Sequence, residues 1–172
     1  MNKITTFEEY SRAAASTQME SCKNEDYLRF GLMSEVGELC AIFKRAIRGD
    51  FKLEDKRADI LLELGDICWY LDRYYEQKYS RPFKLHGNFD YGVMGAVGGS
   101  YNIEMDVVQL MGLCNGIINH IAFPRKFRDC FLTIERISQH FNYSFGDVLT
   151  ANVEKLAKRK ERGLIMGSGD HR

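Results

Sequence analysis

Residues 60–71 read ILLELGDICWYL, an apolar run in which the only charged side chains are Glu63 and Asp66. Apolar residues recur through this run at spacings of three and four, the period of an α-helix with one buried face. The pattern predicts a helix from about Asp55 to about Lys78. Its apolar stripe consists of Ile60, Leu64, Ile67, Leu71 and Tyr74.

A second apolar run lies upstream of the first. Residues 31–43 read GLMSEVGELCAIF and again contain only two charged side chains, Glu35 and Glu38. The spacing predicts a helix that ends near Ile47, and Asn24 is a suitable N-cap because its side chain can accept a hydrogen bond from the first turn. The apolar stripe consists of Leu28, Leu32, Val36, Leu39 and Phe43.

Start signals mark the remaining helices. Thr6 with Glu9, and Ser144 with Asp147, have the spacing of capping boxes, and Pro124 suits the first turn of a helix. The expected helices are 7–19, 104–121, 125–141 and one that starts at Ser144. The sequence therefore predicts an all-α fold, a helical bundle.

Two segments do not follow this helical pattern. Residues 80–103 are rich in glycine and keep no helical period, which indicates an insertion between the third and fourth helices. Residues 164–172 read as a C-terminal tail. We expect residues 1–163 to form a single helical domain.

The composition limits the classes of function. The chain has 172 residues, 24 Lys and Arg against 24 Asp and Glu, and 45% hydrophobic residues, which suits one globular domain. Zero net charge argues against a nucleic-acid partner. The sequence has no run of about 18 apolar residues, and its N-terminus has no apolar segment typical of export. We expect a cytoplasmic protein with no membrane partner.

The four carboxylates of the two apolar runs are the candidate site. Glu35 and Glu38 are three residues apart, as are Glu63 and Asp66, so each pair lies on one side of its helix. A solvated face would be broad and of mixed charge, whereas these acidic pairs stand in otherwise apolar helices. Four carboxylates in a partly buried groove repel one another unless a cation joins them. Oxygen ligands favour Mg²⁺, with Mn²⁺ as a substitute.

A di-iron bundle also places carboxylates between helices, but it requires Glu-x-x-His. The residues three positions before the four histidines are Phe83, Ile117, Ile137 and Ser168, so this motif does not occur.

A basic segment near the C-terminus could bind phosphate. Residues 152–163 read NVEKLAKRKERG, and Lys155, Arg159 and Arg162 share one helix face. Such a run is most often a solvated helix end that complements the macrodipole. Beside an acidic groove, however, it could hold a polyphosphate, and Lys44 could add to it.

These motifs together resemble the MazG-like all-alpha NTP pyrophosphohydrolases. The resemblance rests on Glu35-x-x-Glu38, Glu63-x-x-Asp66 and the later run Asn152-x-x-Lys155-Leu156-x-x-Arg159. It implies that residues 1–163 form a domain of that helical type, a homodimer or homotetramer that hydrolyses nucleoside triphosphates to the monophosphate and pyrophosphate with Mg²⁺. It also implies metal binding by the residues Glu35, Glu38, Glu63 and Asp66, and phosphate contacts by the residues Asn152, Lys155 and Arg159.

The mechanism that we hypothesise is metal-assisted attack of water on the α-phosphorus. Glu38 is the candidate base for the water proton. Trp69, beside the acidic stripe, could stack on the nucleobase, although a core position is an equally good interpretation.

Other functions stay open at this point. The first is a relative with a restricted substrate, such as a dUTP, dCTP or phosphoribosyl-ATP pyrophosphatase. The second is a non-catalytic helical module that binds a nucleotide or a protein. The third is a nucleic-acid-binding protein that uses the basic end, against which net neutrality counts.

Overall fold

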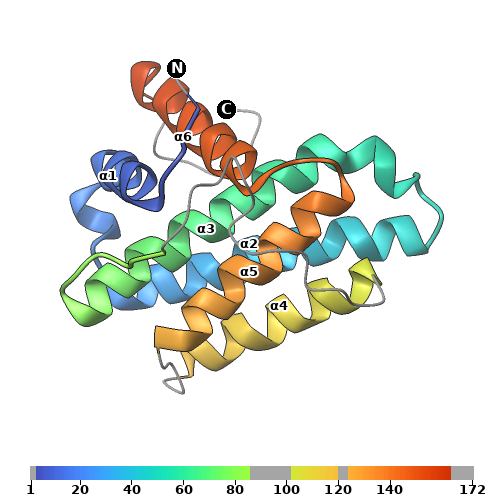
Figure 1. Cartoon of the computed structure of the whole chain (residues 1–172), viewed down its shortest axis with the longest axis horizontal. Helices are drawn as coiled ribbons and strands as arrows, with labels where there is room; N and C mark the ends of the chain where they lie inside the picture. The colour runs from blue at the N-terminus through green and yellow to red at the C-terminus, as the bar shows by residue number, and fades with distance from the viewer. Residues whose placement is uncertain (1–2, 86–101, 120–123, 164–172) are drawn as a thin grey trace.

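The computed structural model describes residues 3–85, 102–119 and 124–163, and this part of the chain contains six α-helices (Figure 1). The all-α prediction is confirmed. The helices are α1 (Phe7–Thr17), α2 (Glu25–Ile47), α3 (Arg57–Tyr79), α4 (Ile103–Ile118), α5 (Pro124–His140) and α6 (Phe145–Glu161). Most of the predicted glycine-rich insertion and the predicted tail lie outside the described residues.

The predicted start signals are present as side-chain hydrogen bonds. Thr6 and Glu9 form a capping box at α1, and Ser144 and Asp147 form another at α6. The Asn24 side chain accepts from the backbone N–H groups of the residues two and three positions later, which caps α2. Each of these caps satisfies N–H groups that a helix start would otherwise leave without a partner.

Three helix boundaries differ from the prediction, and one of them is the end of α4, at Ile118 rather than residue 121, because Asn119 leaves the helical dihedrals with φ −87° and ψ 24°. The first helix ends at Thr17 rather than residue 19, because Gln18 has the extended dihedrals φ −75° and ψ 118°. The third helix starts at Arg57 rather than near Asp55, because Leu53–Lys56 form a turn of 3-10 helix, η2. Another 3-10 turn, η1 (Glu20–Cys22), connects α1 to α2. Short turns of this kind carry no periodic pattern that a sequence could reveal.

Helix α3 is the central element. It contacts α1, α2, α5 and α6, and Figure 1 shows it running between α6 on one side and the pair α4 and α5 on the other. All ten stripe residues predicted for α2 and α3 are buried. Because α3 has neighbours around most of its circumference, it also buries the charged residues Glu63, Asp66, Asp72 and Arg73. The sequence pattern indicates partial burial for Glu63 and Asp66, which stand alone in an apolar run, but it gives no such signal for Asp72 and Arg73.

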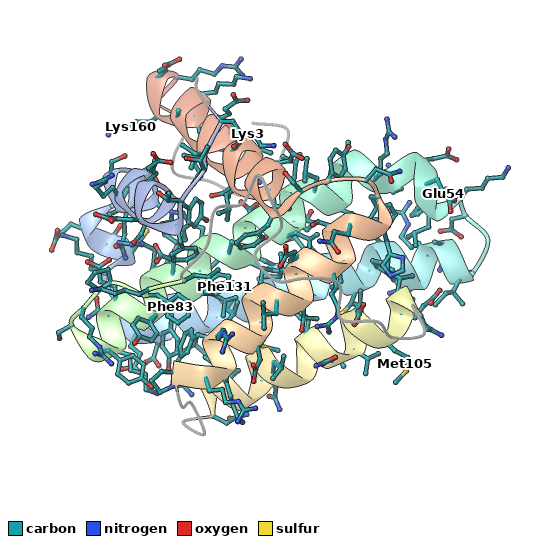
Figure 2. All side chains as sticks on the ribbon, viewed as in Figure 1. Lys3, Glu54, Phe83, Met105, Phe131 and Lys160 are labelled. Carbon is teal, nitrogen blue, oxygen red and sulfur yellow. The ribbon has the colours of Figure 1, made fainter. Side chains whose placement is uncertain are left out.

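An aromatic cluster fills the space between α1, α5 and the segment after α3. The rings of Phe7 and Phe131 lie 4.8 Å apart, and those of Phe83 and Phe131 lie 5.2 Å apart. Figure 2 shows Phe83 and Phe131 close together in the middle of the molecule. Aromatic side chains bury large apolar areas, so this cluster anchors the segment after α3 to the core.

Helices α1 and α6 lie side by side and run in the same direction. Ile4 donates its N–H to Thr150 Oγ1 at 2.9 Å before α1 begins, and Lys160 Nζ donates to the Ser16 carbonyl at 3.0 Å near the end of both helices. Between these contacts, Tyr10 Oη donates to Asn152 Oδ1 at 3.1 Å. The last helix therefore packs along the first over its whole length.

A buried ion pair joins α3 to α1. Arg73 is 3% exposed and Asp72 is fully buried, and the Arg73 guanidinium donates to Asp72, to Glu76 and to both oxygens of Ser11. Burial raises the pKa of Asp72, and the positive charge of Arg73 opposes this rise. A buried carboxylate such as Asp72 destabilises the folded protein if its cationic partner, here Arg73, is removed.

Helix α4 presents apolar side chains to the outside. Met105, Val108 and Met111 are exposed at a spacing of three residues, and Figure 2 shows Met105 pointing away from the molecule. None of the described helices combines the length and the apolar composition that are needed to span a bilayer.

Candidate metal centre

The hairpin of α2 and α3 brings carboxylates from two helices together. Glu35 on α2 and Glu63 and Asp66 on α3 each offer an oxygen, and these oxygens all lie within 4.8 Å of one another. The antiparallel register explains this grouping, because Glu25 accepts from Tyr74 Oη at 3.1 Å near the other end of the same hairpin. Glu35 follows Glu25 by ten residues on α2. Because the helices are antiparallel, its neighbour on α3 lies about ten residues before Tyr74, at Leu64, between Glu63 and Asp66.

These three carboxylates are partly withdrawn from water. Glu63 is 6% exposed, Asp66 is 9% exposed and Glu35 is half-buried. Three anionic oxygen donors without a thiolate or imidazole fit a hard divalent cation such as Mg²⁺, which binds through carboxylates, waters and substrate phosphates. The donor set therefore fits the predicted metal.

Glu38 lies outside this group. It is exposed on α2, and the group of close oxygens consists of Glu35, Glu63 and Asp66 alone among the described residues. The i, i+3 spacing does not by itself exclude Glu38, since Glu63 and Asp66 have the same spacing and both belong to the group, but Glu38 is exposed whereas Glu35 is half-buried. The structure thus gathers three of the four predicted metal ligands.

Asp66 receives two side chains from α6. Asn152 Nδ2 donates to Asp66 Oδ1 at 2.8 Å, and Lys155 Nζ forms an ion pair with Asp66 Oδ2. Both residues had been predicted to contact phosphate. Lys155 carries a positive charge to the edge of the carboxylate group, as that role requires. Asn152 is fully buried and its amide oxygen accepts from Tyr10, so the structure places it on a carboxylate instead.

The other predicted phosphate ligands occupy different positions. Arg159 lies one turn after Lys155 on α6 and is 9% exposed. Arg162 is the exposed C-cap residue of α6. Lys44 is exposed on α2, nine residues from Glu35 and thus about 14 Å farther along the helix. Within the described chain, the structure does not bring Lys44 or Arg162 to the carboxylates.

Trp69 is a core residue. It is 8% exposed, and its Nε1–H donates to Thr17 Oγ1 at 3.1 Å and to the Ala14 carbonyl on α1. This position leaves little ring surface for a nucleobase, so the stacking prediction does not fit the structure. The alternative interpretation of Trp69 as core was the better one.

Tyr70, the next residue, lies beside the carboxylates instead. Its hydroxyl is 3.5 Å from that of Tyr27 on α2. Burial raises the pKa of Tyr70, as do its hydrogen bond to Tyr27 and the negative charges of Glu35 and Asp66, which shows that the ring lies in their field. Sequence reasoning missed both tyrosines. The available signal was that Tyr70 follows Asp66 by four residues, which is one helical turn.

Two glycines allow the helices of the site to approach closely. A Cβ on Gly31 would lie 2.1 Å from the Tyr70 ring, so the Tyr70 side chain can keep its position only while residue 31 has no side chain. A Cβ on Gly65 would lie 2.8 Å from Asn152 Cβ and 3.2 Å from the Val148 carbonyl oxygen. Gly65 therefore sets how near α6 comes to Asp66.

Replacing Gly65 by alanine should destabilise the protein by about 1–3 kcal/mol, because the added methyl group overlaps α6 and cannot be relieved by a flexible side chain. Gly112→Ala on α4 is the matched control, since its Cβ would meet nothing within 4 Å and alanine is the better helix former. Urea denaturation of both variants measures the difference. Equal stability of the two variants would contradict the close packing of α6 on Gly65.

Two open pockets of the described chain lie away from the carboxylates. One, of about 840 Å³, is lined by the cations Arg81, Lys84, Arg125 and Arg128 over the aromatic rings of Tyr75 and Phe83. Another, of about 430 Å³, lies on the other side of residues 82–85. Neither includes the carboxylates, which form a group between helices.

Comparison with known proteins identifies no family. No family model and no solved structure matches the chain. The chain is similar to the Gene 37 protein of Mycobacterium phage L5, with 29% identity over 85 residues, which cover 48% of this chain and 75% of that protein. That name states no activity, so the function has to be argued from the site itself.

Proposed function

We propose that this protein hydrolyses nucleoside triphosphates to the monophosphate and pyrophosphate in the presence of Mg²⁺, and that its bundle is of the all-alpha NTP pyrophosphatase type. The observation that carries the proposal is the group of three withdrawn carboxylates on facing helices, with the Lys155 ammonium bound at its edge. The carboxylates attract a metal ion, which can bind one phosphate group of the substrate. The Lys155 ammonium beside them can bind another phosphate group directly.

The residues divide the chemistry among them. Glu35, Glu63 and Asp66 would hold Mg²⁺, which supplies charge neutralisation and activates water. The exposed carboxylate of Glu38 lies outside the oxygen group, which suits a base that accepts the proton of the attacking water. As the bond between the α-phosphorus and the bridging oxygen breaks, Lys155 and Arg159 offset the negative charge that the leaving pyrophosphate gains.

Tyr27 and Tyr70 are the candidate contacts for the base. Tyr70 follows Asp66 by one helical turn, and its hydroxyl lies 3.5 Å from that of Tyr27 on α2. Burial raises the pKa of both tyrosines, and the charge of Glu35 adds to the rise. A flat base can stack on either ring.

Product analysis on a panel of NTPs and dNTPs tests the proposal. With Mg²⁺ we expect monophosphate and pyrophosphate, and excess EDTA should reduce their formation to the background rate. A single preferred base would define a restricted substrate. Release of diphosphate and phosphate, or turnover that EDTA leaves unchanged, would contradict the proposed reaction. No turnover of any nucleotide by the folded protein would favour the binding module.

The homodimer or homotetramer expected from the resemblance stays a prediction. The exposed residues Met105, Val108 and Met111 on α4 give it a surface to test. Light scattering of the full chain measures the oligomeric state.

A further inference from the structure

We propose that Tyr10 is a positioning residue for the carboxylate group: it fixes the amide of Asn152 so that the amide N–H, and not the amide oxygen, faces Asp66. The inference rests on the proposed function, because it assigns to Tyr10 a role in cation binding. Nothing in the sequence pattern of α1 distinguishes Tyr10 from an ordinary core aromatic residue.

A chain of hydrogen bonds leads from α1 to the carboxylate group. Tyr10 Oη donates to Asn152 Oδ1 at 3.1 Å, and Asn152 Nδ2 donates to Asp66 Oδ1 at 2.8 Å. Tyr10 and Asn152 are both fully buried, so no bulk water can replace either contact. Three helices thus contribute one residue each to a single relay.

The direction of this relay follows from the chemistry of its members. An ionised carboxylate only accepts hydrogen bonds, whereas an amide side chain can present either its N–H₂ or its oxygen by a half turn. A phenol that donates to the amide oxygen removes this choice. Burial raises the pKa of Tyr10 far above its usual value, and the carboxylates of Asp72 and Asp66 add to the rise while Arg73 opposes it. Tyr10 therefore remains a protonated donor.

The consequence for Asp66 concerns its orientation. Oδ1 accepts from Asn152, and Oδ2 accepts from Lys155. These two donors on α6 fix the plane of the carboxylate, and with it the direction in which Asp66 faces the oxygens of Glu35 and Glu63. Partners that orient a metal ligand in this way typically change metal affinity by about 10–100-fold.

A merely structural Tyr10 would also join α1 to α6, so the test must separate the two roles. Tyr74→Phe is the matched control, because Tyr74 is likewise fully buried and donates its hydroxyl to a carboxylate, Glu25, at the far end of the hairpin. Tyr10→Phe and Tyr74→Phe remove the same atom from a hydrogen bond between two helices, a buried one for Tyr10 and a partly buried one for Tyr74. They differ in whether that atom leads to Asp66.

The experiment is a titration of the full chain with Mn²⁺, in which the EPR signal of free Mn²⁺ gives the dissociation constant and circular dichroism gives the melting temperature. Tyr10→Phe should raise the dissociation constant about tenfold, whereas Tyr74→Phe should leave it unchanged even if both variants melt earlier. An unchanged constant for Tyr10→Phe, or equal losses in both variants, would overturn the positioning role. Wild-type protein that binds no Mn²⁺ would overturn the proposed function and this inference with it.

A second variant protects the test against misfolding. In Asn152→Leu the amide is absent, and adding Tyr10→Phe to it removes the phenol that would otherwise be left without its acceptor, so the two Asn152→Leu proteins share the same loss at Asp66. If Tyr10 acts through Asn152, the double variant should bind Mn²⁺ no more weakly than Asn152→Leu alone. Additive losses would show that Tyr10 acts by another route.

Discussion

Glu63→Gln is expected to lower kcat/KM for nucleoside triphosphates by at least about a hundredfold and to weaken Mn²⁺ binding in parallel. Glu63 is 6% exposed and contributes one of the three close oxygens, so its charge attracts a cation through little intervening water. Glutamine keeps the shape and one oxygen but removes that charge. Steady-state kinetics and the Mn²⁺ titration measure the two effects.

Glu38→Gln provides the contrast within the same hairpin. Glu38 is exposed and lies outside the oxygen group, so we expect this variant to lose turnover while it binds Mn²⁺ nearly as the wild type does. Near-normal activity of Glu38→Gln would remove Glu38 from the mechanism. Normal Mn²⁺ binding by Glu63→Gln would instead show that the group of three carboxylates does not hold the cation.

Arg73→Met should lower the free energy of unfolding by about 3–5 kcal/mol, since it leaves a fully buried carboxylate without its cation. The Ser11 oxygens lose their donor as well. Because burial raises the pKa of Asp72, the folded variant prefers the protonated acid. Its stability is therefore greatest below the unfolded pKa of about 3.9 and falls as the pH rises through the raised pKa of the folded state. Urea denaturation across this pH range measures the loss.

The double variant Asp72→Asn, Arg73→Met is the control for this prediction. It removes the charge together with its partner, so it should recover most of the lost stability and should no longer show the pH dependence that Asp72 causes in Arg73→Met. Arg12→Met breaks an exposed pair with Glu8 on α1 and should change stability little. If Arg73→Met were no less stable than Arg12→Met, the buried pair would not be needed for folding.

The helices could be predicted because their signals are local. Thr6, Asn24 and Ser144 cap helices through groups two or three residues away, and the stripes of α2 and α3 repeat within a few turns. The pairing of Glu35 with Glu63 and Asp66 could also be anticipated. Both runs contain isolated carboxylates, and two helices joined by a short connection pack as an antiparallel hairpin.

The features of the site that the sequence did not predict depend on residues far apart along the chain. Asp66 binds Asn152 and Lys155, which follow it by 86 and 89 residues. Trp69 and Tyr70 are adjacent, yet contact with α1 buries the first and leaves the second beside the carboxylates. The rotation of α3 that decides between them is set by tertiary packing, which periodicity does not reveal.

The parallel pairing of α1 with α6 has a consequence for the order of folding. Its hydrogen bonds join residues 142–146 positions apart, whereas the hairpin of α2 and α3 closes over a short connection. Contacts that close long loops are expected to form late, because the chain loses much conformational entropy before these contacts can stabilise it. The acidic ligands thus come together while α6, with Asn152 and Lys155, is still undocked. For that interval Lys155 does not offset their mutual repulsion, so, if the proposed metal site exists, we expect a divalent cation to favour folding as well as activity.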